Sequence, residues 1–256
     1  MTKEDNEKFL LTYNAADYEK PNTSVDTVIY TVLNNCLCVL TVKRDEPPFK
    51  NSWALVGGFI DISKDTNLEA TAMRKLVEKT GVKTPYLEQF ATIGNKRRDP
   101  RGWSVTTVYF ALIPHEQVKF KVGKGTSDIK WSVIINGKVK DALAFDHSEI
   151  LAMCTERLRS KVLYTSLPVY LMSDKFTLGE LQKIYEIILD KKIDHKAFRR
   201  RILAADILEE VDEMRRDGTR PAQLYRLIEG EGAHYFARNI EGGCLKIADK
   251  IITDIT

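Results

Sequence analysis

Residues 53–82 read WALVGGFIDISKDTNLEATAMRKLVEKTGV, and the elements that they predict decide the fold of the front half of the chain. An apolar strand from Trp53 to Val56 leads to Gly57-Gly58, where glycine lets the backbone turn sharply and approach a ligand. Apolar residues at three- and four-residue spacing from Leu68 to Val77 indicate a helix. Gly81 ends it, since glycine is the usual residue just past a helix C-terminus.

This strand, glycine pair and helix resemble the Nudix box, the signature of hydrolases that cleave nucleoside diphosphates linked to another group. The family pattern closes with Arg-Glu, an apolar residue, any residue, Glu-Glu, any residue and Gly. Here the closing positions hold Arg74-Lys75, Leu76-Val77, Glu78-Lys79 and Thr80-Gly81. An earlier glutamate of the pattern falls on Thr66, and the loop before the helix is longer than in the pattern.

The altered positions are those that carry the chemistry of the family. Its carboxylates hold Mg²⁺ against a pyrophosphate, because hard cations need oxygen ligands. Lys75 and Lys79 stand at two of these positions. A unit charge ~4 Å from a cation interacts by ~4 kcal/mol at an effective dielectric of ~20, so two attractions become two repulsions. The sequence therefore predicts no metal site and no catalytic residues, in a pocket where lysine can still hold phosphate as a point charge.

The length and composition of the chain allow two domains. At 256 residues the chain is long for one domain, and 43% apolar residues are enough for real cores. A net charge of +3 is weak evidence for a nucleic-acid partner. The four cysteines form no Cys-x-x-Cys pair, and no apolar run of ~18 residues occurs. We expect a cytoplasmic protein with reduced thiols, no cofactor and no membrane segment.

Around the box the chain predicts mixed strands and few helices. Two β-branched runs flank Asn34-Asn35, which is a hairpin signal because asparagine tolerates positive φ. Residues 1–22 predict a disordered arm or an exchanged N-terminal segment. Further strands are predicted at 87–94, 105–114 and 128–135, and a helix at 147–163. This order fits the α/β/α sandwich of the Nudix fold.

A loop between two predicted strands, residues 95–103, carries four cations. One interpretation is a solvated hairpin tip. The other is a phosphate clamp, because arginine makes bidentate contacts to phosphate. The loop resembles the RDPRG segment of Nudix proteins that act on or bind ADP-ribose-like molecules, which favours the clamp. The string Leu143 to His147 also recurs in that group. His147 either touches the ligand or is a capping or packing residue of the fold.

Residues 164–174 predict a domain boundary, so we divide the chain into a Nudix-like domain, 1–165, and a second domain, 166–256. In the second domain, Thr177 and Glu180 form a capping box, and Asp194 caps a second helix. Two helices joined by a turn of about four residues match the helix-turn-helix signature. The second helix of such a motif reaches base edges in the major groove.

The basic character of this second helix has two interpretations. Residues 191–201 hold six Lys or Arg side chains against one acid, but an acidic run follows at 206–213 and a solvated face is the alternative. A basic turn near Gly218 and a strand at 220–228 then complete the order of a winged helix. The candidate DNA-binding residues are Lys196, Arg199, Arg200, Arg201, Arg215 and Arg216.

The pairing of an altered Nudix box with a winged helix resembles the Nudix-related transcriptional regulators of NAD metabolism in bacteria. The stretches FTLGELQKIYE (176–186), FRRR (198–201) and AQLYRL (222–227) match the C-terminal half of that family. The resemblance implies an α+β chain and a homodimeric repressor. It also implies that the Nudix-like domain binds ADP-ribose, or a related NAD-derived nucleotide, and then releases a pseudo-palindromic operator of double-stranded DNA.

We expect eight residues to surround the ligand: Arg44, Gly57, Gly58, Phe59, Lys75, Glu78, Arg98 and Arg101. The rival hypothesis is a Mg²⁺-dependent ADP-ribose pyrophosphatase with an appended DNA-binding domain. It requires carboxylates to regroup around Mg²⁺ through the longer loop, the candidates being Asp61, Asp65, Glu69 and Glu78. A third possibility is a protein-interaction module, for which binding would not show the salt dependence of phosphate contacts.

Overall fold

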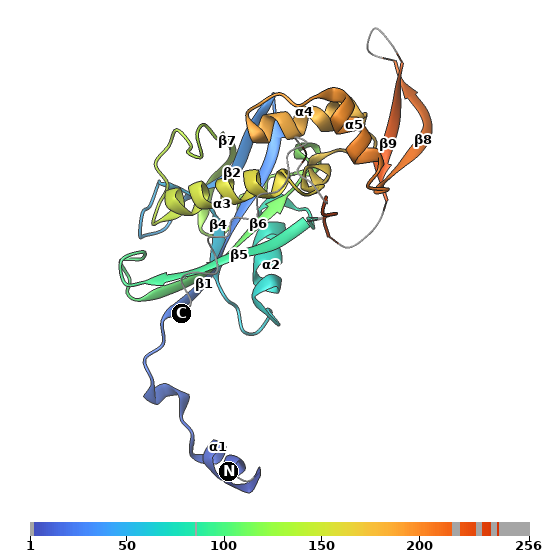
Figure 1. The fold of residues 1–256 in the computed structure, drawn as a ribbon. Coiled ribbons are helices and arrows are strands. Elements are labelled where there is room, and N and C mark those ends of the chain that lie inside the picture. Colours follow the sequence, from blue (N-terminus) through green and yellow to red (C-terminus); the bar gives the residue numbers. More distant parts are fainter. Residues whose placement is uncertain (1–2, 85, 217–220, 229–231, 237–239, 241–256) are drawn as a thin grey trace, which may run out of the picture.

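The structure, a computed structural model, describes residues 3–84, 86–216, 221–228, 232–236 and 240. A body built on a β-sheet is joined to a smaller unit of two helices and a hairpin, and an N-terminal arm extends away from the body (Figure 1). None of the described helices is long and apolar enough to cross a membrane.

The described residues of the body contain one seven-stranded sheet, in which β3-β2-β1-β6-β5 are neighbours, β4 pairs with β1, and β7 pairs with β2. The strands are β1 (Asn22–Leu33), β2 (Cys36–Arg44), β3 (Trp53–Ala54), β4 (Val56–Phe59), β5 (Tyr86–Asn95), β6 (Ser104–Leu112) and β7 (Thr126–Val133). Strands β1 and β6 run parallel, and the other pairs are antiparallel. The predicted hairpin at Asn34-Asn35 is confirmed, since both residues have positive φ, 50° and 60°.

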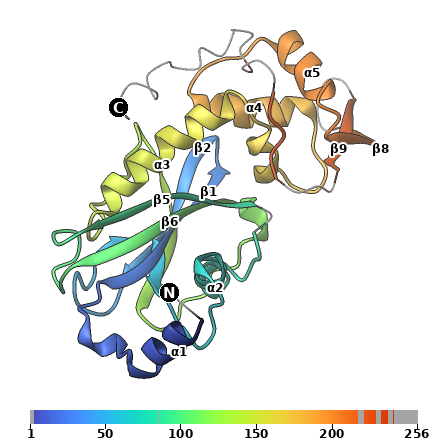
Figure 2. The ribbon, with the colours of Figure 1, turned by 60° about the horizontal axis from the view of Figure 1, so that its bottom comes forward.

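Two helices cover opposite faces of the sheet (Figure 2): α2 (Leu68–Thr80) and α3 (His147–Val162). Side chains of β1 alternate between the two faces. Val28 and Tyr30 join the core beneath α3, whereas Ile29 joins the core beneath α2 with Leu76. The predicted α/β/α sandwich is confirmed.

Helix α2 has the ends that the sequence predicts. Asn67 caps its start by accepting a hydrogen bond from the Ala70 amide, and Gly81 ends it with φ 72°. The predicted sharp turn at Gly57-Gly58 is wrong, because both glycines lie inside β4 and pair with β1. Glycine is needed at Gly57 for close approach instead: an added Cβ would lie 2.2 Å from Oδ1 of Asp26.

The smaller unit has winged-helix order: α4 (Leu178–Leu189), α5 (His195–Leu203), β8 (Leu208–Arg215) and β9 (Ala222–Leu227). The Thr177–Glu180 capping box and the Asp194 cap are both present. Backbone hydrogen bonds between Phe176 and Tyr225 fasten the start of α4 to the hairpin. The tip of the hairpin, 217–220, and most of the C-terminal extension lie outside the described residues.

Most of the segment predicted as a domain boundary, residues 165–171, is buried. A 3-10 helix, Leu167–Leu171, has all its residues in the interior, and the Tyr185 hydroxyl donates to the Thr165 carbonyl at 2.9 Å. One apolar core runs from Val28 on β1 to Phe198 on α5. The body and the winged unit therefore pack as neighbours, and a division at residue 165 stays a prediction.

The N-terminal arm is more ordered than the sequence predicts. Helix α1 (Lys3–Thr12) precedes a 3-10 turn, Ala15–Asp17, and α1 has no buried residue. A Lys8–Glu4 ion pair at one-turn spacing supports the helix, and Phe9, Leu10 and Leu11 remain exposed.

Candidate ligand pocket and nucleic-acid interface

One pocket of about 860 Å³ is lined by all eight predicted ligand residues. Strand β2 contributes its last residue, Arg44, and β4 contributes both glycines and Phe59. Helix α2 contributes Lys75 and Glu78. The loop between β5 and β6 supplies the remaining two, Arg98 and Arg101. The structure therefore brings the eight predicted residues into one pocket, and that they bind a ligand stays a prediction.

Arg98 lies in the floor of the pocket, with only 7% of its surface exposed. Its guanidinium donates to both carboxylate oxygens of Asp146, at 3.0 and 3.1 Å, and to Asp26 at 3.2 Å. A longer contact of 3.4 Å joins it to the Ser104 hydroxyl. A phosphate clamp at Arg98 stays a prediction, and a phosphate group there would have to compete with these buried carboxylates for the guanidinium.

Asp26 and His147 complete this floor, and both are buried. Burial alone would raise the pKa of the Asp26 carboxyl, but hydrogen bonding from His147 and Thr106 and the charge of Arg98 lower it to about 2. His147 accepts a hydrogen bond from the Leu55 amide at Nδ1 (3.0 Å), which turns Nε2 toward Asp26 at 3.6 Å. Of its two predicted roles, His147 shows packing, while its ring also lines the pocket.

Two phenyl rings and two arginines form a stack on the wall. The Arg101 guanidinium lies 4.9 Å from the centre of the Phe59 ring and 5.8 Å from that of Phe145. Arg44 lies 5.0 Å from the Phe145 ring, and Asp99 binds Arg101 from the side. Phe145 has φ 57°, a strained value for a bulky residue. Sequence reasoning missed Phe145, although the recurring string Leu143 to His147 contains it.

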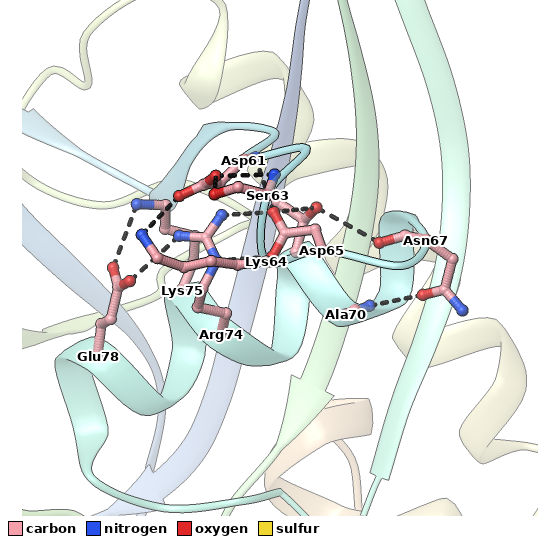
Figure 3. Close-up of polar contacts among 10 residues, drawn as sticks. Asp61, Ser63, Lys64, Asp65, Asn67, Ala70, Arg74, Lys75 and Glu78 are labelled. Carbon is pink, nitrogen blue, oxygen red and sulfur yellow. Dashed lines mark hydrogen bonds and ion pairs between the residues drawn. The ribbon is translucent and has the colours of Figure 1, made fainter.

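Charged side chains of the altered box form ion pairs with one another (Figure 3). Arg74 binds the Asp65 carboxylate through two hydrogen bonds, at 2.7 and 2.5 Å, and reaches Glu78 at 3.1 Å. Lys75 approaches the other oxygen of Glu78 at 3.2 Å. Hydrogen bonding from Arg74 holds the pKa of Asp65 well below its usual range. An added Cβ on Gly58 would lie 2.9 Å from Cε of Lys75, so glycine leaves room for the lysine.

Lys79, the second lysine at a carboxylate position of the pattern, is also engaged. Its ammonium donates to the Thr126 hydroxyl at 2.8 Å and lies 3.5 Å from the Lys124 carbonyl. Burial lowers the pKa of Lys79. This lysine therefore ties α2 to the start of β7 and to the loop before it, and it also lines the pocket.

The Nudix resemblance implies Mg²⁺, and the side chains here do not fit it. Asp61 is paired with Lys64 at 2.6 Å, and Asp65 and Glu78 are paired as described above. Glu69, the remaining carboxylate of the rival hypothesis, is exposed. Across the described part of the chain, no three His, Cys, Asp or Glu side chains lie together as metal ligands would.

The predicted DNA-binding residues fall into two groups. Lys196, Arg199 and Arg200 are exposed on α5, whose opposite side packs Phe198 and Ile202 into the core. The others differ: Arg201 is half-buried, Arg216 is exposed beside the hairpin tip, and Arg215 pairs with Glu180 at the start of α4. Strand β8 exposes acids at 209, 210, 212 and 213, so basic charge is concentrated on α5.

A Nudix-type sandwich with a cation-rich pocket, joined to a winged helix with a basic second helix, defines a Nudix-related transcription regulator. Comparisons with known proteins agree. Residues 21–150 match the NUDIX domain, and residues 168–227 match the NrtR DNA-binding winged helix domain. The chain belongs to the NrtR family of transcriptional repressors.

A curated relative and two solved structures support this assignment. The ADPR responsive transcriptional repressor NtrR of Acinetobacter baylyi is 46% identical over 233 residues, which span 91% of this chain and 92% of the relative. NrtR of Shewanella oneidensis, solved with a 27mer DNA, matches with TM-score 0.79 and 42% identity over 85% of this chain and 98% of that one. Its NUDIX domain, solved with ADP ribose, matches with TM-score 0.54 and 38% identity over 62% of this chain and 99% of that one.

Proposed function

We propose that this chain is a homodimeric repressor of genes of NAD metabolism, and that its Nudix domain binds ADP-ribose or a related NAD-derived nucleotide and thereby releases DNA. The observation that carries the proposal is the pocket. A box altered to lysine, with its carboxylates already paired, shares a chain with a winged helix that exposes a basic helix. The repressor relative and the DNA-bound and ADP-ribose-bound structures named above support the same function.

The charge of the pocket suits a pyrophosphate. Among the described residues that line it, eight Lys or Arg side chains stand against five Asp or Glu. Its volume of about 860 Å³ lies within the range of small-molecule sites. Arg44 and Arg101 are the arginines nearest to the stacked rings, and arginine binds phosphate with two parallel hydrogen bonds. Phe59 and Phe145 offer flat faces to a base or ribose.

We further propose that the ligand binds without a metal and leaves intact. Lys75 supplies positive charge beside Glu78, where the Nudix pattern expects a carboxylate. A metal-bound nucleophile would need oxygen ligands that are not already neutralised. Lys64, Arg74 and Lys75 pair with three of the four candidate carboxylates, Asp61, Asp65 and Glu78, and this pairing supports the proposal over the rival hypothesis of a hydrolase.

On the DNA side, Lys196, Arg199 and Arg200 present three cations on one exposed helix, in the position of a recognition helix. A homodimer would place two such helices on successive turns of a pseudo-palindromic operator. We assign Arg215 to the architecture of the wing, because Glu180 binds it.

A gel-shift experiment tests the proposed function. The full chain is incubated with a fragment of an NAD-biosynthesis promoter while ADP-ribose is titrated, with Mg²⁺ and with EDTA. We expect a shifted band that ADP-ribose dissolves equally in both conditions. Failure to shift any such fragment, or release that requires Mg²⁺, would contradict it.

A further inference from the structure

Helix α3 reaches from the ligand pocket to the winged unit. Its first residue, His147, lines the pocket, and its last turns lie beside α4 (Figures 1 and 2). Its 16 residues span ~24 Å at ~1.5 Å per residue. One rigid element therefore contacts both places that a ligand-controlled repressor must connect.

At the pocket, the start of α3 is held by Arg98. Asp146 occupies the cap position of the helix, where an aspartate usually accepts a hydrogen bond from its own helix. This side chain makes no such bond. Both of its oxygens accept hydrogen bonds from the Arg98 guanidinium, which also lines the pocket.

At the other end, α3 holds the helix-turn-helix through Arg159. The Nε of Arg159 donates to the carbonyl of Ile188 at 3.0 Å in a partly buried contact. Ile188 lies in the last turn of α4, where carbonyls lack partners within the helix. The chain then turns through Asp190, at φ 55°, and enters α5. Arg159 therefore fixes the end of α4 from which the recognition helix departs.

Between these ends α3 is packed as a solid body. Ile150, Leu151, Cys154, Leu158 and Val162 are fully buried along its inner side. Close-packed interiors transmit displacement because they leave little room to absorb it. Near the winged unit, Lys161 also pairs with Glu88 on β5, so the far end is guided by the sheet.

We propose that Arg159 is a positioning residue that couples occupancy of the pocket to the placement of the recognition helix. An anionic ligand competes with Asp146 for the Arg98 guanidinium, the start of α3 shifts, and Arg159 carries the shift to the turn between α4 and α5. This inference rests on the proposed function, since it requires one ligand in the pocket and DNA on α5. A helix shift of this kind is a known form of switching.

The test compares Arg159→Met with the matched control Arg157→Met, because Arg157 is an exposed arginine on the same helix. Fluorescence anisotropy gives the Kd for operator DNA without ligand and with saturating ADP-ribose, and the ratio of the two Kd values measures coupling. Isothermal titration calorimetry gives the Kd for ADP-ribose. Thermal melting shows that each variant is folded.

We expect Arg159→Met to reduce the ratio by about fivefold or more, the lower end of usual allosteric coupling. Its Kd for ADP-ribose stays within about twofold of the wild type, since Arg159 does not line the pocket. Arg159→Lys, which keeps a donor and a charge, recovers part of the ratio, and Arg157→Met keeps the wild-type ratio.

One result would overturn the inference: an unchanged ratio of the two Kd values in folded Arg159→Met. This holds whether or not DNA binding itself weakens, because a purely structural residue would lose DNA affinity equally with and without ADP-ribose. If Arg159→Met does not fold, an unchanged ratio in Arg159→Ala or Arg159→Gln has the same force. A wild-type chain whose DNA affinity ignores ADP-ribose would instead refute the proposed function itself, and the inference with it.

Discussion

Replacement of Arg98 by methionine separates two roles for this residue. A phosphate clamp would lose ligand affinity and keep its stability. The structure places Arg98 instead between Asp26 and Asp146, with 5% of its side chain exposed. Removing one partner of a buried ion pair costs about 3–5 kcal/mol, because the remaining charge is buried without compensation. Here two carboxylates lose their shared partner, so we expect Arg98→Met to lower the free energy of unfolding by an amount near the top of that range.

Urea denaturation at neutral pH, followed by circular dichroism, measures this loss. Arg97→Met is the matched control, since Arg97 is the exposed neighbour in the same loop. Surface substitutions of that kind usually change the free energy of unfolding by no more than about 0.5 kcal/mol. If Arg98→Met came within about 1 kcal/mol of Arg97→Met while ADP-ribose binding was lost, the buried network would be refuted, and a role for Arg98 limited to binding phosphate would be supported.

Three further predictions concern the pocket floor and the DNA surface. Gly57→Ala places a Cβ 2.2 Å from Oδ1 of Asp26, so we expect the free energy of unfolding to fall by about 1–3 kcal/mol and ligand binding to weaken. In the control Gly123→Ala the added Cβ meets no atom within 4 Å, and we expect urea denaturation to show unchanged stability. The pKa of Asp26 is lowered from 3.8 in the unfolded chain to about 2 in the fold, so ionised Asp26 stabilises the fold fully above pH 3.8 and this stabilisation is lost as pH falls toward 2. The difference in free energy of unfolding between wild type and Asp26→Asn should therefore shrink by about 2 kcal/mol from pH 5 to pH 2 in urea titrations. Arg200→Ala should weaken DNA binding and reduce the slope of log K against log salt by about 1, and a slope unchanged from wild type would place Arg200 off the phosphates.

Features that depend only on a few neighbouring residues could be predicted from the sequence. The Asn34-Asn35 hairpin, the end of α2 at Gly81, and the Thr177 capping box each depend on neighbours along the chain. The spacing of apolar residues then gave the faces of α2, α4 and α5, because burial follows the helical period. Together with the resemblance to the Nudix box and to the family's C-terminal half, these local signals predicted the sandwich and the winged helix.

Side-chain roles in the pocket could not be predicted, because their partners are distant in sequence. Gly57 lies in a strand because of β1, and Arg98 is buried because Asp26 and Asp146 converge on it. Lys79 turns toward Thr126 on β7, far from its position in the box pattern. Only a three-dimensional structure shows which carboxylate meets which cation.

The most direct test of a metal-free sensor is calorimetric titration of ADP-ribose into the full chain in EDTA, followed by chromatography of the recovered ligand. We predict saturable binding, the same affinity after Mg²⁺ replaces EDTA, and recovery of intact ADP-ribose after both titrations. Binding that appears only with Mg²⁺, or conversion of the ligand to AMP, would contradict the proposal and establish the hydrolase.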